Sequence, residues 1–152
     1  MAAGTLAAAL GKGLVAGAVG TAAMTGAQAI EMRLNGRGGS DVPAQAVKAI
    51  AGAEPSNETG EARLNVAAHW GYGTAIGALR GLLALTPLSA PGATAVHFAT
   101  IYTMQQAMMP ALGVGQPTWR YGGQALAMDV GFHVVYAAAA GVAYSLLDRE
   151  RG

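Results

Sequence analysis

The segment from Gly122 to Leu147 most constrains the fold of this chain. It is apolar and long enough to cross a bilayer, which takes about 20 residues of helix. A carboxyl group at Asp129 and an imidazole at His133 interrupt it one helical turn apart. Ionisable groups at membrane depth are costly and need partners. The segment therefore predicts a membrane-embedded helix packed against further helices, rather than an isolated anchor.

The composition agrees with a membrane protein. The chain is 53% hydrophobic and 11% charged, whereas soluble domains carry about 25% charged residues. Its 23 glycines fit helices that approach closely in lipid. A net charge of +1 offers no basic surface for nucleic acid, and the lack of cysteine excludes disulfides, thiolate metal sites and cysteine nucleophiles.

Four apolar stretches of bilayer length predict four membrane-spanning helices. Their approximate ranges are 10–30, 61–86, 91–109 and 121–147. The loop 34–60 carries helix signals of its own, because Ser40 or Asp41 can cap a turn that contains Pro43, and Gly52 can end it. We predict an all-α membrane protein, with residues 1–152 forming one domain: a small four-helix transmembrane bundle plus one short amphipathic surface helix.

Basic residues give a slight bias in orientation. With four spans, the 34–60 loop side holds Arg33, Arg37, Lys48, Arg63 and Arg120, and the other side holds Lys12, Arg149 and Arg151. Since cytoplasmic loops carry more Lys and Arg, this count favours a cytoplasmic 34–60 loop.

Small residues repeat at four-residue spacing on the first two predicted spans. Gly73, Gly77 and Gly81 form one row, and Gly13 and Gly17 begin another. Such rows let two helix backbones approach closely. We expect the two rows to pack helices within one chain, because the first two spans need a partner. Self-association, or contact with a larger membrane complex, is the alternative.

Polar side chains at similar depth predict a buried cluster. Counted from the 34–60 loop side, His97 and His133 both lie about 18 Å into the membrane at 1.5 Å per residue. Asp129 and His69 lie somewhat shallower. Tyr136 shares a helical face with Asp129 and His133. Three helices could therefore direct these five side chains to one interior zone.

Several roles suit this cluster. It forms a hydrogen-bonded network that fixes helix register, or it handles protons or ions, since histidine titrates near neutral pH. A divalent metal bound by His69, His97, Asp129 and His133 is another alternative, and a haem between His97 and His133 is a further one. The identity of any cofactor stays open.

Arg80 stands apart from this cluster, near the far end of the second span. It can extend to that membrane surface or contact a lipid headgroup or another anion. Enzymatic chemistry has little support, because no serine lies in a GxSxG context and no glycine-rich loop follows a strand.

The stretch from Val96 to Leu147 resembles the YagU-like family of small bacterial inner-membrane proteins. The similar features are His97, Met109-Pro110-Ala111-Leu112-Gly113, Pro117, Trp119, Asp129 and His133. The chain departs from that family in having fewer tryptophans and Asp129 in place of Glu. The segment from Gly13 to Pro43 resembles the opening of small actinobacterial membrane proteins of unknown function.

These resemblances imply a multi-pass protein of the bacterial cytoplasmic membrane, with a link to acid tolerance in the first family, and they supply no catalytic residues. The leading hypothesis is an accessory or assembly component of the lipid bilayer with a buried His/Asp network. The alternative is a proton-, ion- or metal-handling protein that uses the same cluster.

Overall fold

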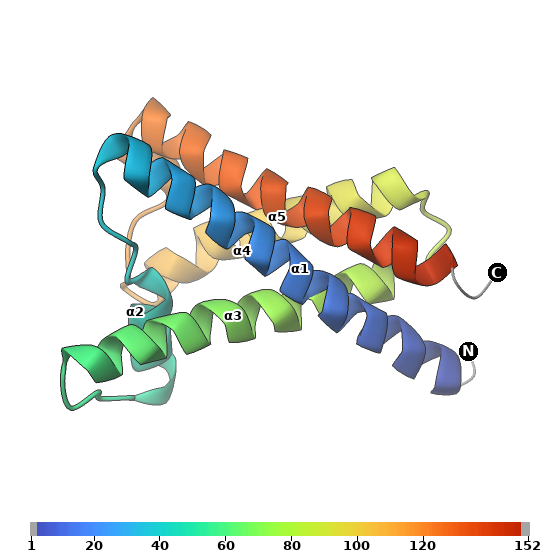
Figure 1. The fold of residues 1–152 in the computed structure, drawn as a ribbon, viewed down its shortest axis with the longest axis horizontal. Helices are drawn as coiled ribbons and strands as arrows, with labels where there is room; N and C mark the ends of the chain where they lie inside the picture. The colour runs from blue at the N-terminus through green and yellow to red at the C-terminus, as the bar shows by residue number, and fades with distance from the viewer. Residues whose placement is uncertain (1–2, 150–152) are drawn as a thin grey trace.

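The computed structural model describes residues 3–149, so Arg151 lies outside the described residues. Within this range the chain is all-helical, which confirms the predicted all-α class (Figure 1). Five α-helices and one short 3-10 helix follow in the order α1 (Ala3–Asn35), α2 (Val42–Ala51), α3 (Glu58–Leu83), α4 (Ala90–Ala111), η1 (Thr118–Tyr121) and α5 (Gly123–Arg149). The 3-10 helix was not predicted.

The four long helices run between two ends of the molecule. Figure 1 shows the starts of α1 and α4 and the ends of α3 and α5 at one end, which we call the terminal end. The other end, the loop end, holds α2 and η1. Helix α1 crosses α3 and packs along α5, so it contacts both sides of the bundle.

Local signals account for the helix boundaries. The Asn57 side chain accepts a hydrogen bond from the Gly60 N–H at 2.9 Å and caps α3. Ser89 caps α4 in the same way through the Gly92 N–H. Helix α2 ends at Gly52, whose φ of 63° is the left-handed conformation that glycine adopts readily.

Helix α2 is docked on the first turns of α3. The Asn65 side chain accepts from the Ala44 N–H at 3.0 Å and donates to the Ser40 carbonyl at 2.8 Å. Lys48 and Glu61 form an ion pair at 2.8 Å. The hydrogen bond to Glu61 raises the pKa of Lys48. These contacts hold the 34–60 loop against the bundle.

Two of the described helices, α1 and α5, are long and apolar enough to cross a membrane. Within residues 3–149, α3 and α4 do not reach the same level of apolar character, because α3 carries charged residues and an asparagine and α4 carries a histidine and two glutamines. In α1 and in α5, only 33% of the apolar 18-residue stretch is buried inside the protein. The core helix of a soluble protein is mostly buried.

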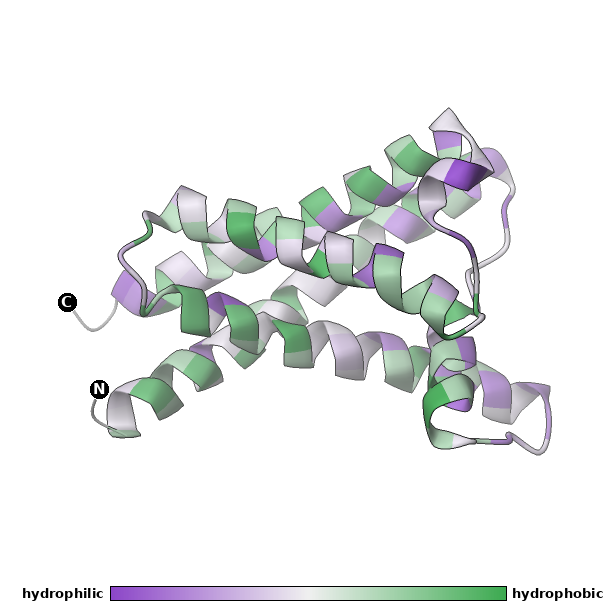
Figure 2. Ribbon diagram, turned by 180° about the vertical axis from the view of Figure 1, so that it is seen from behind, coloured by the Kyte–Doolittle hydropathy of each residue, from purple (hydrophilic) through white to green (hydrophobic). Residues whose placement is uncertain are grey.

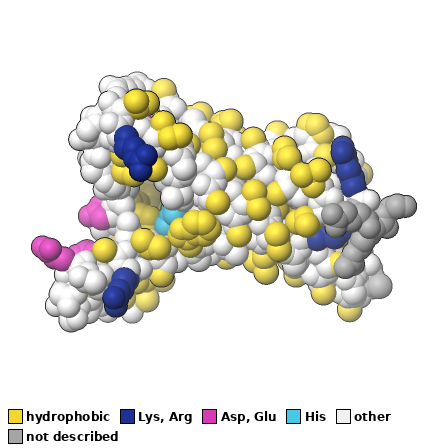
Figure 3. Space-filling model, in the orientation of Figure 1, with side chains coloured by type: hydrophobic (Ala, Val, Ile, Leu, Met, Phe, Trp, Pro, Cys, Tyr) yellow, Lys and Arg dark blue, Asp and Glu magenta, His cyan; other side chains and the backbone are white. Residues whose placement is uncertain are grey.

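On the face shown in Figure 3, hydrophobic side chains are spread over the surface between the two ends of the molecule. Exposed large hydrophobics occur on every long helix, among them Val15, Val66, Val96 and Val142. Charged side chains gather at the two ends in Figure 3, and Figure 2 shows hydrophobic ribbon along the central parts of the helices. Soluble monomers rarely expose so much contiguous apolar surface.

Candidate functional site

The two glycine rows face each other where α1 crosses α3. A methyl group added at Gly13 would lie 2.6 Å from the Gly77 carbonyl oxygen, and one at Gly17 would lie 2.6 Å from the Thr74 carbonyl oxygen. A methyl group at Gly81 would meet the backbone of Ala9. Because each obstacle is backbone, which cannot move aside, these positions admit only glycine without a shift of one helix.

The same crossing continues toward the loop end with polar contacts. A methyl group at Gly73 would meet the Thr21 side chain, and Gly73 also accepts a hydrogen bond through its carbonyl from the Tyr136 hydroxyl at 2.6 Å. Tyr136 belongs to α5, and its ring lies against Gly20 of α1. Tyr136 therefore links α5 to both helices of the crossing.

Asp129 is the centre of a hydrogen-bonded cluster that joins α4, η1 and α5. Its carboxylate accepts from Thr118 Oγ1 at 2.8 Å, from Gln106 Nε2 at 3.0 Å and from Gln105 Nε2 at 3.2 Å. The Thr118 N–H donates to Gln106 Oε1 at 2.8 Å, which closes the cluster. We call Asp129, Gln105, Gln106 and Thr118 the Asp129 cluster.

His133 lies beside this cluster. Its Nδ1 is 2.8 Å from the Asp129 backbone carbonyl oxygen and 3.4 Å from the carboxylate Oδ1. A carbonyl oxygen only accepts, so the proton is on Nδ1. The ring of Tyr102 meets the imidazole edge-on at 5.5 Å between centroids.

His97 is fully buried and faces a different helix. Its Nε2 lies 3.2 Å from the Ile76 carbonyl oxygen on α3, which likewise only accepts, so Nε2 carries the proton. The His97 Nδ1 and the Tyr102 hydroxyl are buried without a hydrogen-bond partner among the described residues. The imidazole lies 5.7 Å from the ring of Tyr136.

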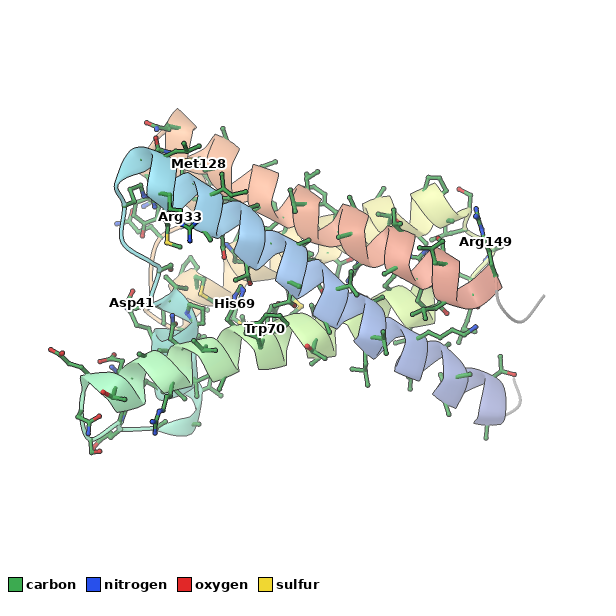
Figure 4. The ribbon with its side chains drawn as sticks, in the orientation of Figure 1. Arg33, Asp41, His69, Trp70, Met128 and Arg149 are labelled. Atoms are coloured by element: carbon green, nitrogen blue, oxygen red, sulfur yellow. The ribbon has the colours of Figure 1, made fainter. Side chains whose placement is uncertain are left out.

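His69 lies in a cleft that opens at the loop end. Figure 3 shows a hollow at this end of the molecule with a histidine side chain in it, and Figure 4 labels His69 on α3. His69 Nε2 is 3.0 Å from Thr25 Oγ1, and that hydroxyl donates its hydrogen to the Thr21 carbonyl at 2.7 Å. The Thr25 oxygen therefore accepts from His69.

The predicted cluster is thus divided. The structure brings Asp129 and His133 together, while His69 faces α1 and His97 faces the α3 backbone. In residues 3–149, no three His, Asp or Glu side chains lie close enough to hold one metal ion. The similar height of these residues that the sequence predicts did not produce a shared site, because each histidine faces a different neighbour.

The partners of Asp129 were not predicted from the sequence. Neither the two glutamines, Gln105 and Gln106, nor Thr118 was among the candidate site residues. Its signal is weak: a hydroxyl residue directly after Pro117, in a connection between two apolar segments.

Arg80 is buried near the terminal end, only 2% exposed, so it does not extend to the surface. Its guanidinium lies 4.7 Å from the centroid of the Tyr144 ring, and its Nε and Nη1 have no hydrogen-bond partner among the described residues. Lys12 and Asp148 form an ion pair at 2.7 Å at the same end of the bundle. Contact of Arg80 with a lipid or another anion stays a prediction.

Comparisons of the chain with protein-family models, with curated proteins and with solved structures found no match. The resemblance to the YagU-like family therefore stays a prediction.

Proposed function

We propose that this protein is a multi-pass membrane protein in which α1, α3, α4 and α5 all cross the bilayer, and that it acts as an accessory or assembly component of the bacterial cytoplasmic membrane. The observation that carries this proposal is the exposed apolar surface on all four long helices, between two charged ends. That surface needs a nonpolar medium around the whole bundle.

The two less apolar helices are suited to the same environment. Helix α4 carries no Asp, Glu, Lys or Arg along its 22 residues, which extend over about 33 Å. Helix α3 has none between Arg63 and Arg80, and Arg80 is covered by Tyr144. A bilayer core is about 30 Å thick, so both helices have the required length. Their small residues face neighbouring helices. In the assembled bundle, α3 and α4 therefore need less apolar character than a helix that inserts alone.

An accessory role follows from how the buried polar groups are used. Hydrogen bonds join the Asp129 cluster, Tyr136 and His69 to other helices. His133 bonds to the backbone. Interhelical hydrogen bonds of this kind stabilise membrane bundles by about 0.6 kcal/mol each, and up to about 2. They fix the register of α4 and α5, which lie outside the glycine crossing of α1 with α3.

The proposal is tested by labelling single cysteines in intact membranes, which is clean because the natural chain has none. The positions are Ser56, Thr86 and Gln116, one in each of three connections between long helices. Four spans predict that a membrane-impermeant maleimide labels Ser56→Cys and Gln116→Cys from one side and Thr86→Cys only from the other. An additional cysteine at Val19, at the middle of α1, should not react from either side.

Thr86 separates this arrangement from one in which only α1 and α5 cross. With two spans, α3 and α4 remain on the loop side, and Thr86→Cys is labelled together with Ser56→Cys. That result, or release of the protein from membranes by alkaline carbonate, would refute the four-span proposal.

Proton handling is the second candidate, because the His97 Nδ1 and the Tyr102 hydroxyl are buried without partners. Both residues lie on α4 and face α5, where the His97 ring lies near the Tyr136 ring and the Tyr102 ring meets the His133 imidazole. In proteoliposomes with an imposed pH gradient, this candidate predicts proton flux that His97→Leu abolishes while the protein stays folded. Flux equal to that of empty liposomes favours the accessory role.

A further inference from the structure

An apolar groove runs along the outside of the bundle between α4 and α5. It has a volume of about 610 Å³ and opens to the surroundings of the protein. Small side chains, among them Ala95, Ala137 and Ala138, make up much of its lining, and Phe98 and Val134 line its inner end. Helices α4 and α5 touch below it, where a methyl group at Gly141 would meet the Thr94 side chain.

The walls of the groove offer no hydrogen bonds to a ligand along most of its length. Thr94 and Ser145 are the hydroxyl residues that line it. The Thr94 hydroxyl donates to the Ala90 carbonyl at 3.0 Å, and the Ser145 hydroxyl donates to the Gly141 carbonyl at 2.9 Å. Both hydroxyls are therefore used within their own helices, and the groove suits a hydrocarbon chain.

The groove extends through about one leaflet. On α5 its lining runs from Val134 to Arg149, about 22 Å at 1.5 Å per residue. Val134 follows His133, which lies near the middle of the predicted span, and Arg149 lies at the terminal end (Figure 4). Half of a bilayer core is about 15 Å, so a groove of this length reaches from the membrane centre to the headgroup region.

The outer end of the groove is positively charged. Arg149 lines it, and α4 begins there at Ala90 and Pro91 with the positive end of its helix dipole. The carboxylate of Asp148, next to Arg149 in the sequence, is paired with Lys12 of α1. Since the inner end is aromatic and apolar, the groove has the polarity of a lipid with an anionic headgroup. A transmembrane helix of a second copy would match the apolar part but not this charged end.

We infer that the α4–α5 groove binds one phospholipid of the terminal-side leaflet, with an acyl chain along Ala138 and Ala95 and its phosphate at Arg149. This inference rests on the proposed membrane arrangement, because only then does the groove face lipid. A bound acyl chain would fill the groove that remains beside the contact between the two helices at Gly141.

The test is native mass spectrometry of the full-length protein in detergent, titrated with phosphatidylglycerol or with phosphatidylcholine. We expect the wild type to bind one phosphatidylglycerol about fivefold more tightly than phosphatidylcholine, the effect of about one basic residue near the headgroup. Arg149→Gln should remove that preference. Arg120→Gln, which removes an exposed arginine at the loop end, is the matched control and should keep it.

The acyl part is tested by filling the groove. Ala138→Phe should weaken binding of both lipids at least fivefold, whereas Ala99→Phe, also at an exposed position but outside the groove, should not. The inference is wrong if Arg149→Gln and Arg120→Gln behave alike, or if Ala138→Phe binds lipid like the wild type. It is also wrong if no lipid binds and Ala138→Phe converts a dimer to a monomer, since the groove then holds a second copy.

The Thr86→Cys labelling separates this failure from failure of the proposed function. If Thr86 lies on the side opposite to Ser56 and the lipid results are negative, only the lipid site is refuted. If Thr86 lies on the same side as Ser56, the four-span arrangement fails, and the lipid site fails with it.

Discussion

The α1–α3 crossing and the α4–α5 contact each hold two helices together, but they do so with different parts of the chain. At the crossing, glycines bring two backbones together, and no side chain could enter without moving a helix. Between α4 and α5, side chains do the work: the Asp129 cluster joins the helices at the loop end, and a groove separates their outer surfaces toward the terminal end. A contact between backbone atoms therefore tolerates no added side chain. A contact made by side chains loses stability in proportion to the groups removed, and it leaves space for a ligand.

Substitution at the α1–α3 crossing should cause the largest loss of stability. Gly77→Leu places a side chain against the backbone of Gly13 and Gly17, so we expect a loss of about 3 kcal/mol or more in stability, or failure to fold. Thermal unfolding in detergent measures it. Gly71→Leu is the matched control on the same helix, because a methyl group there meets nothing within 4 Å. Equal stability of the two variants would contradict a crossing within the monomer.

At the α4–α5 contact, the loss of stability should scale with the hydrogen bonds that a substitution removes. Asp129→Ala leaves the donors of Gln106 and Thr118 without their acceptor, which should cost about 1–3 kcal/mol. Asp129→Asn keeps one acceptor oxygen and should cost less. Chemical unfolding of both variants checks the order, and an Asp129→Ala protein as stable as the wild type would show that the cluster does not hold α4 to α5.

Tyr136 connects the two regions, and its hydroxyl can be removed alone. Tyr136→Phe loses the 2.6 Å hydrogen bond to the Gly73 carbonyl but keeps the ring against Gly20. We expect a loss of about 1 kcal/mol, seen as a lower unfolding midpoint. Val134→Ala, at an exposed position on the same helix, serves as a control for general effects of substitution in α5. If Tyr136→Phe exceeds Gly77→Leu in effect, the ranking of the two regions is reversed.

The exposed ion pair of α2 should have the smallest effect. The pKa of Lys48 is raised by its bond to Glu61, so the folded state holds the proton more tightly than the unfolded state. The contribution to stability is therefore complete below the ordinary lysine pKa of 10.5 and is lost as the pH rises through the higher folded value. Comparison of Lys48→Met with the wild type should show a slight difference near neutral pH that disappears in strong alkali and in high salt. A difference that grows with pH would contradict this sign.

The sequence predicted the two regions unequally. Four-residue glycine spacing identifies a contact surface without knowledge of the partner, because all members of the row share one helix face. The rows on α1 and α3 do face each other. Depth counting for His69, His97 and His133 gave only their height along the bundle. It could not give the direction in which each helix turns its face, and this direction separates His69 and His97 from Asp129.

The groove and the Thr118 contact were beyond the sequence for a related reason. The Thr118 contact depends on the connection 112–122 folding back so that η1 lies against α4 and α5, and the groove depends on how closely α4 and α5 pack at the terminal end. No periodic pattern marks such a fold-back. By contrast, Pro43 and Gly52 mark the ends of α2 through local backbone preferences, and these operate wherever the helix packs.

The central claim is that the histidines serve the packing of the helices and do not bind a cofactor: His97 bonds to the α3 backbone, and His133 bonds to the backbone of its own helix beside the Asp129 cluster. Elemental analysis and an optical spectrum of the detergent-purified protein, beside His97→Ala and His133→Ala, test it most directly. We predict no stoichiometric metal and no Soret band in the wild type, with both variants less stable because each loses a hydrogen bond to a backbone carbonyl. One metal or haem per chain in the wild type, absent from both variants, would contradict the claim.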